Sequence, residues 1–147
     1  MNLIVRPSDP PAADGTLITV TPDSAGWSYV GFEALSLAPG RPARRESGDR
    51  EVCVVVVCGR VDIRSAHGEW AAVGGRSDPF SGAPEAAYLP PHTDLELEAA
   101  GGPCELGLCY APAREGVAPR LLPARDVVGE SRGYGAQERT IHPILMG

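Results

Sequence analysis

The fold of this chain follows from one stretch: Pro39-Gly40, then Arg44-Arg45-Glu46-Ser47, then Glu51-Val52-Cys53-Val54-Val55-Val56-Val57-Cys58-Gly59. A Pro-Gly turn leads through a charged loop to a glutamate, which opens an apolar run that a glycine closes. An unbroken apolar run of this length is typical of a strand that is covered on both faces. The stretch therefore predicts a buried β-strand with a turn at each end.

Further short apolar segments lie on both sides of this strand, with turn residues between them. Within 27–37, for example, Leu35 and Leu37 are in phase with Trp27 and Tyr29, as in a strand with two distinct faces. No window of about 12 residues has the apolar period of a helix. Regular short strands without helices predict an all-β sandwich or barrel. We expect strands at 17–21, 27–37, 51–58, 60–64, 69–73, 85–89, 93–98 and 105–110, and a hairpin turn at 66–68.

The character of the sequence changes after Pro112. Segment 119–123 predicts one more strand or an extended arm, and 129–137 is polar and Gly-rich, as in a loop or linker. We therefore expect residues 1–122 to form one barrel and residues 123–147 to form an extended arm. The apolar ending of that arm favours self-association, so we expect a homo-oligomer.

The composition indicates a single globular domain and argues against several kinds of partner. The 147 residues suffice for one domain with a core, and the 18 Gly and 15 Pro beside 43% hydrophobic residues indicate many turns between strands. The net charge of -6 argues against a nucleic-acid partner. No apolar run approaches the ~18 residues of a membrane helix, and the N-terminus lacks the apolar core of a secretory signal. We expect a cytoplasmic protein with no membrane partner.

The four cysteines form two pairs in sequence, Cys53/Cys58 and Cys104/Cys109, each inside an apolar segment. The odd offset within a pair places the two side chains on opposite faces of a strand. Neither pair therefore predicts a local zinc site. In a reducing compartment we expect buried, reduced thiols.

The opening stretch resembles the first sequence motif of a cupin barrel. The second cupin motif, Pro-x-Gly-x-x-His, is matched by its leading proline in Pro90-Pro91-His92-Thr93-Asp94-Leu95. The resemblance implies a cupin-type double-stranded β-helix, a single jelly-roll barrel. The histidine positions of the two motifs fall near Arg45, Ser47 and Leu95, so the usual metal ligands are missing. Glu51 alone makes a poor transition-metal site.

A longer resemblance covers residues 17–145. The segment Thr21-Pro22-Asp23-Ser24-Ala25-Gly26-Trp27-Ser28-Tyr29-Val30-Gly31-Phe32-Glu33 resembles the N-terminal signature of the 5-deoxy-glucuronate isomerase family. These are two-cupin enzymes of inositol catabolism, related to 5-keto-4-deoxyuronate isomerase of pectin breakdown. Further matches follow in order: Gly74-Gly75-Arg76, Tyr88-Leu89-Pro90-Pro91, Cys109-Tyr110-Ala111-Pro112-Ala113, Arg132-Gly133 and Arg139-Thr140-Ile141-His142-Pro143-Ile144-Leu145.

The resemblance implies the N-terminal half of an aldose–ketose isomerase that converts 5-deoxy-glucuronate to 2-deoxy-5-keto-gluconate. In that family a divalent metal such as zinc or manganese is bound by His-x-His, Glu and His of the second cupin. This sequence contains no His-x-His and nothing that matches that set. We therefore assign no catalytic residue, no metal ligand and no cofactor to this chain, and expect a sugar acid as its small-molecule partner if it is enzymatic.

Three residues in the C-terminal stretch are candidates for contact with the sugar acid: Arg132, Arg139 and His142. Arginine suits bidentate recognition of a carboxylate. The alternative is that this stretch packs against a second barrel, and we favour that alternative for His142. The other two histidines, His67 and His92, are typical of exposed turns.

Two other groups have a functional and a structural interpretation. The clustered arginines could meet an anionic sugar, but a solvated, mutually paired loop is favoured; they are Arg41, Arg44, Arg45 and Arg50, interleaved with Glu46, Asp49 and Glu51. For the larger aromatic residues we favour a place in the core or barrel lining, and the alternative is that they form a wall on which a sugar stacks. They are Trp27, Tyr29, Phe32 and Trp70.

The sequence leaves two functions open. The chain is either half of an isomerase or a non-catalytic, metal-free cupin module for oligomerisation or small-molecule binding. A metal-dependent dioxygenase is disfavoured, because that chemistry needs the same missing histidines.

Overall fold

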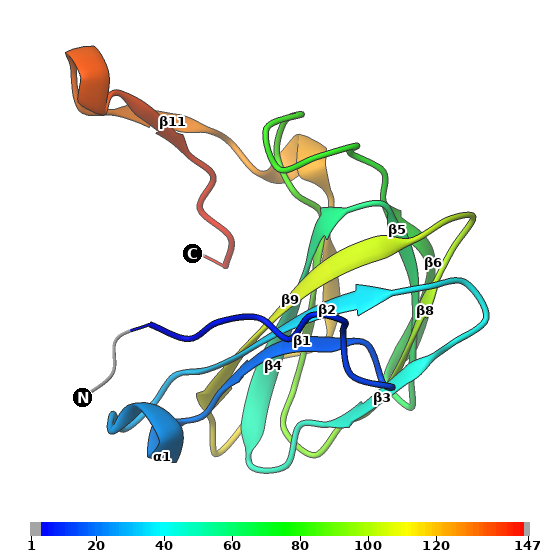
Figure 1. Ribbon diagram of the computed structural model, residues 1–147. Coiled ribbons are helices and arrows are strands. Elements are labelled where there is room, and N and C mark those ends of the chain that lie inside the picture. Colours follow the sequence, from blue (N-terminus) through cyan, green and yellow to red (C-terminus); the bar gives the residue numbers. More distant parts are fainter. Residues whose placement is uncertain (1–3, 146–147) are drawn as a thin grey trace.

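The computed structural model describes residues 4–145 and has two antiparallel sheets that face each other, with a separate hairpin outside them (Figure 1). In spatial order, the six-stranded sheet contains β1 (Thr16–Val20), β2 (Gly31–Leu37), β9 (Cys104–Pro112), β4 (Arg50–Cys58), β7 (Ala86–Leu89) and β10 (Arg120–Leu122). The four-stranded sheet contains β3 (Ala43–Glu46), β8 (Asp94–Ala99), β5 (Arg60–Ser65) and β6 (Gly68–Gly74). The expected all-β barrel is confirmed.

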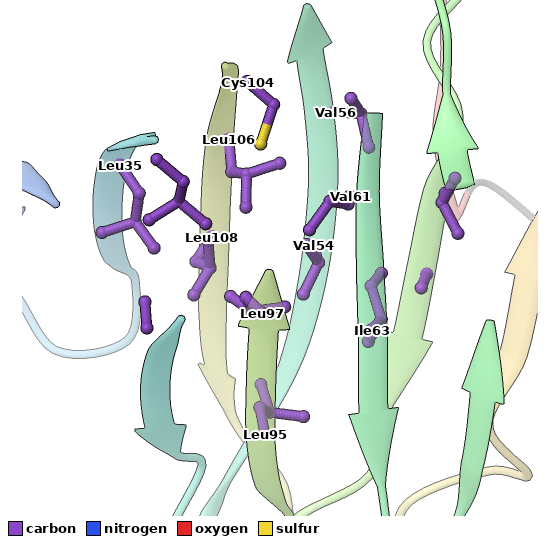
Figure 2. Packing of buried hydrophobic residues seen from close by; sticks show 14 of the residues in the cluster. Leu35, Val54, Val56, Val61, Ile63, Leu95, Leu97, Cys104, Leu106 and Leu108 are labelled. Carbon is purple, nitrogen blue, oxygen red and sulfur yellow. The ribbon is translucent and has the colours of Figure 1, made fainter. Parts of the chain in front are cut away.

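Aliphatic side chains from both sheets fill the interior of the barrel (Figure 2). On β4, Val52, Val54 and Val56 are fully buried and belong to this core, whereas the alternate residues face outward. Leu97 on β8 and Ile63 on β5 supply the opposite wall. Close packing of this kind makes the middle of the barrel a core rather than a ligand pocket.

A short helix, α1 (Pro22–Ala25), precedes β2 and corrects the expected strand at 27–37. Thr21 caps the helix, with its side chain accepting from the Ser24 amide while the Ser24 hydroxyl accepts from the Thr21 amide. Gly26 ends the helix in the left-handed region at φ 70°. The strand can therefore begin only at Gly31.

This later start exposes two aromatic residues that we expected in the core or lining. Trp27 and Tyr29 are 51% and 69% exposed, because they precede the strand. Phe32 is half-buried and lies opposite Cys109, away from the core. Trp70 packs against the core, as expected.

Gly59 closes β4 because no other residue fits there. Its φ is +76°, and a Cβ atom would lie 2.5 Å from the carbonyl oxygen of Pro103 and 2.8 Å from Cβ of Cys104. The chain can thus turn directly from β4 in one sheet into β5 in the other.

Beyond β10 the chain forms an arm that projects from the barrel (Figure 1). Its elements are η1 (Ala124–Asp126), β11 (Glu130–Arg132), η2 (Gly135–Gln137) and β12 (Arg139–Ile141). The loop or linker expected at 129–137 is therefore partly wrong, since β11 and β12 pair as an exposed hairpin. The domain boundary after residue 122 stays a prediction. None of the helices in residues 4–145 has the length and apolar character that crossing a bilayer requires.

Candidate functional site

Four polar or charged residues gather at one mouth of the barrel, and we call them the mouth cluster. They are Glu33 on β2, Arg45 on β3, Arg50 on β4 and Tyr110 on β9. Glu33 is in phase with the core residue Leu35, so its strand directs it inward. The cluster therefore draws on both sheets.

An ion pair joins the two sheets at this mouth. Arg45 Nε lies 2.6 Å from Glu33 Oε2, and the two side chains are only 13% and 17% exposed. Arg45 Nη2 also donates to Thr16 Oγ1 at 2.7 Å and lies 3.1 Å from Asp14 Oδ2. These partners satisfy the hydrogen-bonding groups and the charge of the Arg45 guanidinium, which is partly shielded from water.

Burial changes the ionisation of the cluster. Burial disfavours the charge of Arg45, but the hydrogen bond and the charge of Glu33 outweigh it and raise the Arg45 pKa. Burial also raises the pKa of Tyr110, and the Glu33 charge adds to that rise. The buried Tyr110 hydroxyl lies near Glu33 yet makes no well-aligned hydrogen bond within residues 4–145. Arg50 stacks on the Tyr110 ring, 4.4 Å from its centroid.

Two neighbouring loops, 47–48 and 90–93, are joined by a set of hydrogen bonds that we call the Ser47–Thr93 clasp. The Ser47 amide donates to Thr93 O at 2.9 Å, and the Thr93 amide donates to Ser47 Oγ at 2.8 Å. Both hydroxyls donate to Pro90 O, and the His92 amide donates to Gly48 O at 2.7 Å. Both Ser47 and Thr93 are fully buried, so the clasp is part of the fold.

The residues at the cupin ligand positions do not fit a transition metal. Arg45 brings a positive charge, Ser47 is held in the clasp, and Leu95 belongs to the core. Glu51 alternates to the outer face, where its Oε2 accepts from the Tyr88 hydroxyl at 2.8 Å. Burial raises the pKa of Tyr88, and this hydrogen bond adds to the rise. Among residues 4–145, no group of three or more His, Cys, Asp or Glu residues could hold a metal ion.

The predicted substrate-binding residues lie on the arm, away from the mouth cluster. The hairpin brings Arg132 and Arg139 together as directly opposed partners. Arg132 pairs with Glu130 at 2.8 Å, and Arg139 donates to Gln137 O at 3.3 Å. The half-buried His142 lies close to Gly129. Contact of Arg132, Arg139 and His142 with substrate stays a prediction.

The remaining histidines are where the sequence predicted them. His67 lies in the turn between β5 and β6. The His92 side chain is 70% exposed in a bend and lies 3.7 Å from Asp49. Neither points into the barrel core, whose members are all apolar or aromatic.

The expected mutually paired arginine loop is wrong for Arg44 and Arg45, although the Arg44 side chain is 81% exposed, as expected of a solvated position. Arg44 and Arg45 lie on strand β3, which pairs with β8 and places Arg44 opposite Glu96. Arg44 Nη2 lies 2.9 Å from Glu96 Oε2, while Arg45 binds Glu33. Both arginines thus find their partners on other strands rather than among their sequence neighbours.

Sequence reasoning missed two members of the mouth cluster, Glu33 and Tyr110. The signal for Glu33 was present, because a carboxylate in phase with Leu35 and Leu37 stands on the core face of its strand. Its partner Arg45 lies in the other sheet, and no local pattern predicts that contact.

A groove of about 630 Å³ lies beside the cluster and includes residues of β3, β5, β6 and β8. Its charged residues are Arg44, Arg45, Arg64, Glu46, Glu69, Asp94 and Glu96. Glu96 is paired with both Arg44 and Arg64, which leaves little free positive charge there. The groove is therefore poorly suited to a sugar carboxylate.

Comparison with known proteins gives consistent matches. The KduI/IolB family model matches residues 3–147. The 5-deoxy-glucuronate isomerase of Geobacillus thermodenitrificans is 38% identical over 145 residues, which is 99% of this chain and 53% of the relative. The Geobacillus kaustophilus protein of the same name is 38% identical over 146 residues, 99% of this chain and 52% of the relative. The chain spans about half the length of the curated relatives it matches.

Solved structures agree with this result. An IolB-like protein from Salmonella typhimurium LT2 superposes with a TM-score of 0.82 at 33% identity, covering 87% of this chain and 49% of the other. A putative glyoxylate-induced protein from Pseudomonas aeruginosa shares the fold, with a TM-score of 0.60 at 13% identity, over 81% of this chain and 45% of the other. The two facing sheets and these likenesses confirm the expected cupin-type barrel.

Proposed function

The chain belongs to the KduI/IolB family, and from this membership we propose that it is the N-terminal barrel of a 5-deoxy-glucuronate isomerase. Relatives with that name match it over 99% of its length. Because the chain spans about half of each relative, we propose that a second barrel supplies the catalytic centre and its divalent metal. We also propose a cytoplasmic location, as for an enzyme of sugar catabolism.

Isomerisation of an aldose to a ketose moves a proton between adjacent carbons. It needs a base beside the carbon and a stabiliser for the oxyanion that develops. A bound divalent metal supplies that stabilisation as a Lewis acid. The match to these relatives carries our assignment. The Glu33–Arg45 pair supports a metal site outside this barrel, because a positively charged, ion-paired arginine lies near a cupin ligand position. This barrel then contributes packing, and the arm contributes Arg132, Arg139 and His142 toward the substrate carboxylate.

The isolated chain tests the first part of the proposal. After dialysis we expect no stoichiometric zinc or manganese by elemental analysis and little isomerase turnover. Stoichiometric metal together with turnover would contradict the assignment of catalysis to a second barrel.

A fusion of this chain to the second half of the Geobacillus thermodenitrificans relative tests the second part. We expect the fusion to isomerise 5-deoxy-glucuronate, and Arg139→Gln to raise KM about tenfold by removing one carboxylate contact. Arg125→Gln is the matched control, because Arg125 lies on the same arm and is 82% exposed. An equal KM for both variants would remove Arg139 from the binding site.

The second candidate function is a non-catalytic module that assembles with copies of itself. Exposed apolar residues beside the six-stranded sheet favour it, including Trp27 at 51% and Val30 at 52%. Light scattering tests this: we expect a homo-oligomer that Trp27→Ser weakens, whereas a monomer at all concentrations would exclude it.

A further inference from the structure

Cys53 and Cys109 lie directly opposite each other on β4 and β9, the two central strands of the six-stranded sheet. Opposed residues of an antiparallel pair have Cα atoms about 4.5 to 5.5 Å apart. That spacing falls inside the range of about 4.4 to 6.8 Å found across disulfides. Both residues are free thiols, so the register of the two strands places their Cα atoms at a spacing that a disulfide can bridge.

The two thiols lie on the outer face of the barrel. They alternate with the core residues Val52, Val54 and Leu108 of the same strands. Cys109 is exposed, whereas Cys53 is 8% exposed. Both line a cavity of about 230 Å³ that Leu145 of the arm also lines. A small solute can therefore reach Cys109 first, with Cys53 beside it.

The second pair of cysteines has a different geometry. A register shift between Val56 and Cys58 places Cys58 opposite Glu105 rather than opposite Cys104. Cys104 is 1% exposed and belongs to the core. The opposed arrangement thus distinguishes Cys53 and Cys109 from the other two thiols.

We propose that Cys53 and Cys109 are a reversible dithiol–disulfide pair that small-molecule disulfides, such as glutathione disulfide, oxidise. The Cys109 thiolate attacks one sulfur of glutathione disulfide, whose S–S bond breaks and releases one glutathione. Cys53 then loses its proton, attacks the Cys109 sulfur and releases the second glutathione. The two protein thiols give up two electrons and two protons, which end on the two glutathione thiols.

Ionisation sets the rate of this exchange, because the thiolate is the attacking form. Burial raises the pKa of Cys53 to about 12, with smaller contributions from Cys109 and Glu51, and burial also raises the pKa of Cys109. Oxidation is therefore slow at neutral pH and accelerates as the pH rises. A high pKa of the Cys53 thiol also makes it a poor leaving group when the disulfide is reduced.

Oxidation with glutathione disulfide at pH 8.5, followed by acid quenching and digestion with a glutamate-specific protease, tests the proposal. Glu105 lies between Cys104 and Cys109, so this protease separates them, whereas no arginine lies between them for trypsin. We expect a disulfide that joins the peptide 52–69 to the peptide 106–115. The protein should lose two of its four thiols in a thiol count.

Single variants identify the residues within those peptides. Cys58→Ala and Cys104→Ser should keep the cross-link, and Cys109→Ser should abolish it. Because the wild-type digest needs no variant, a variant that fails to fold leaves the test intact. A link to the peptide 99–105, a stable glutathione adduct on Cys109, or four unreacted thiols would each overturn the proposal.

Discussion

The pair formed by Glu33 and Arg45 connects the two sheets through side chains that are 17% and 13% exposed. Loss of one partner from such a pair leaves the other charge partly dehydrated without compensation. We expect Glu33→Gln to lower the free energy of unfolding by about 2 kcal/mol. Urea denaturation measures the change. Glu98→Gln is the control, since its partner Arg64 is 39% exposed and the loss of stability should be clearly smaller than for Glu33→Gln. Equal costs would show that the mouth pair is no stronger than a surface pair.

Buried acids of the barrel should make the protein sensitive to alkali. Burial raises the pKa of Cys53 from 9.0 to about 12 and of Cys104 from 9.0 to about 11, and it also raises that of Tyr110. Between these values the unfolded chain loses a proton that the native protein keeps, so stability falls as the pH rises above about 9. Each group contributes up to about 1.4 kcal/mol per pH unit in that window.

The measurement is the urea midpoint at pH 8 and at pH 10.5. We expect a lower midpoint at pH 10.5 and a smaller decrease in Cys53→Ala, which lacks one of these acids. A midpoint that stays constant across this range would contradict the raised pKa values.

Some residue positions could be predicted from the sequence, and others could not. The existence of strand β4 and the exposed turns at His67 and His92 follow from local pattern and turn chemistry, and the structure agrees. The apolar run predicted cover on both faces of β4, but Val55 and Val57 on its outer face are only half-buried. The Glu33–Arg45 contact does not follow, because a side chain's partner across the barrel depends on how two sheets stack.

Strand β4 depends on the glycine that ends it. Gly59 and Gly40 both have positive φ, +76° and +73°, but a Cβ atom at Gly40 would meet nothing within 4 Å. Gly40→Ala should therefore cost about 1 kcal/mol for backbone strain alone. Gly59→Ala adds a clash with the backbone of Pro103 and should cost about 3 kcal/mol or more. Thermal and urea unfolding compare the two, and equal losses would mean that the backbone relaxes around the new methyl group.

The elements that sequence reasoning missed are the shortest ones. Strands β3 and β11 have four and three residues, too few to show a period, and both are charged. Helix α1 has four residues and depends on its Thr21 cap rather than on an apolar face. Long apolar strands are predictable because burial selects their residues, whereas these elements form through pairing and capping.

The arm and the barrel can be separated by truncation. Strand β10 pairs with β7, and Val127 beyond it is 8% exposed, so the barrel makes contacts past residue 122. We expect a chain ending at residue 128 to keep the urea midpoint of the full chain. A chain ending at residue 122 should lose about 2 kcal/mol, the contribution of a buried valine. If the chain that ends at residue 128 is unfolded, the β11–β12 hairpin is part of the barrel's fold.

For the molecule as a whole, the family likeness predicted the barrel, and the matches to isomerases of about twice its length agree with it. The mouth cluster was not predicted, since the cupin motif marks the ligand positions but not the residues that replace the ligands. Here Arg45 lies near one such position and forms an ion pair with Glu33 of the opposite sheet.

The Ser47–Thr93 clasp should also make the two loops that it joins separate in a single step. Its amide donors at Ser47, His92 and Thr93 interlock the same two loops, so none is released while the others hold. Their amide protons should then exchange with deuterium at one shared rate, which reports how often the two loops separate.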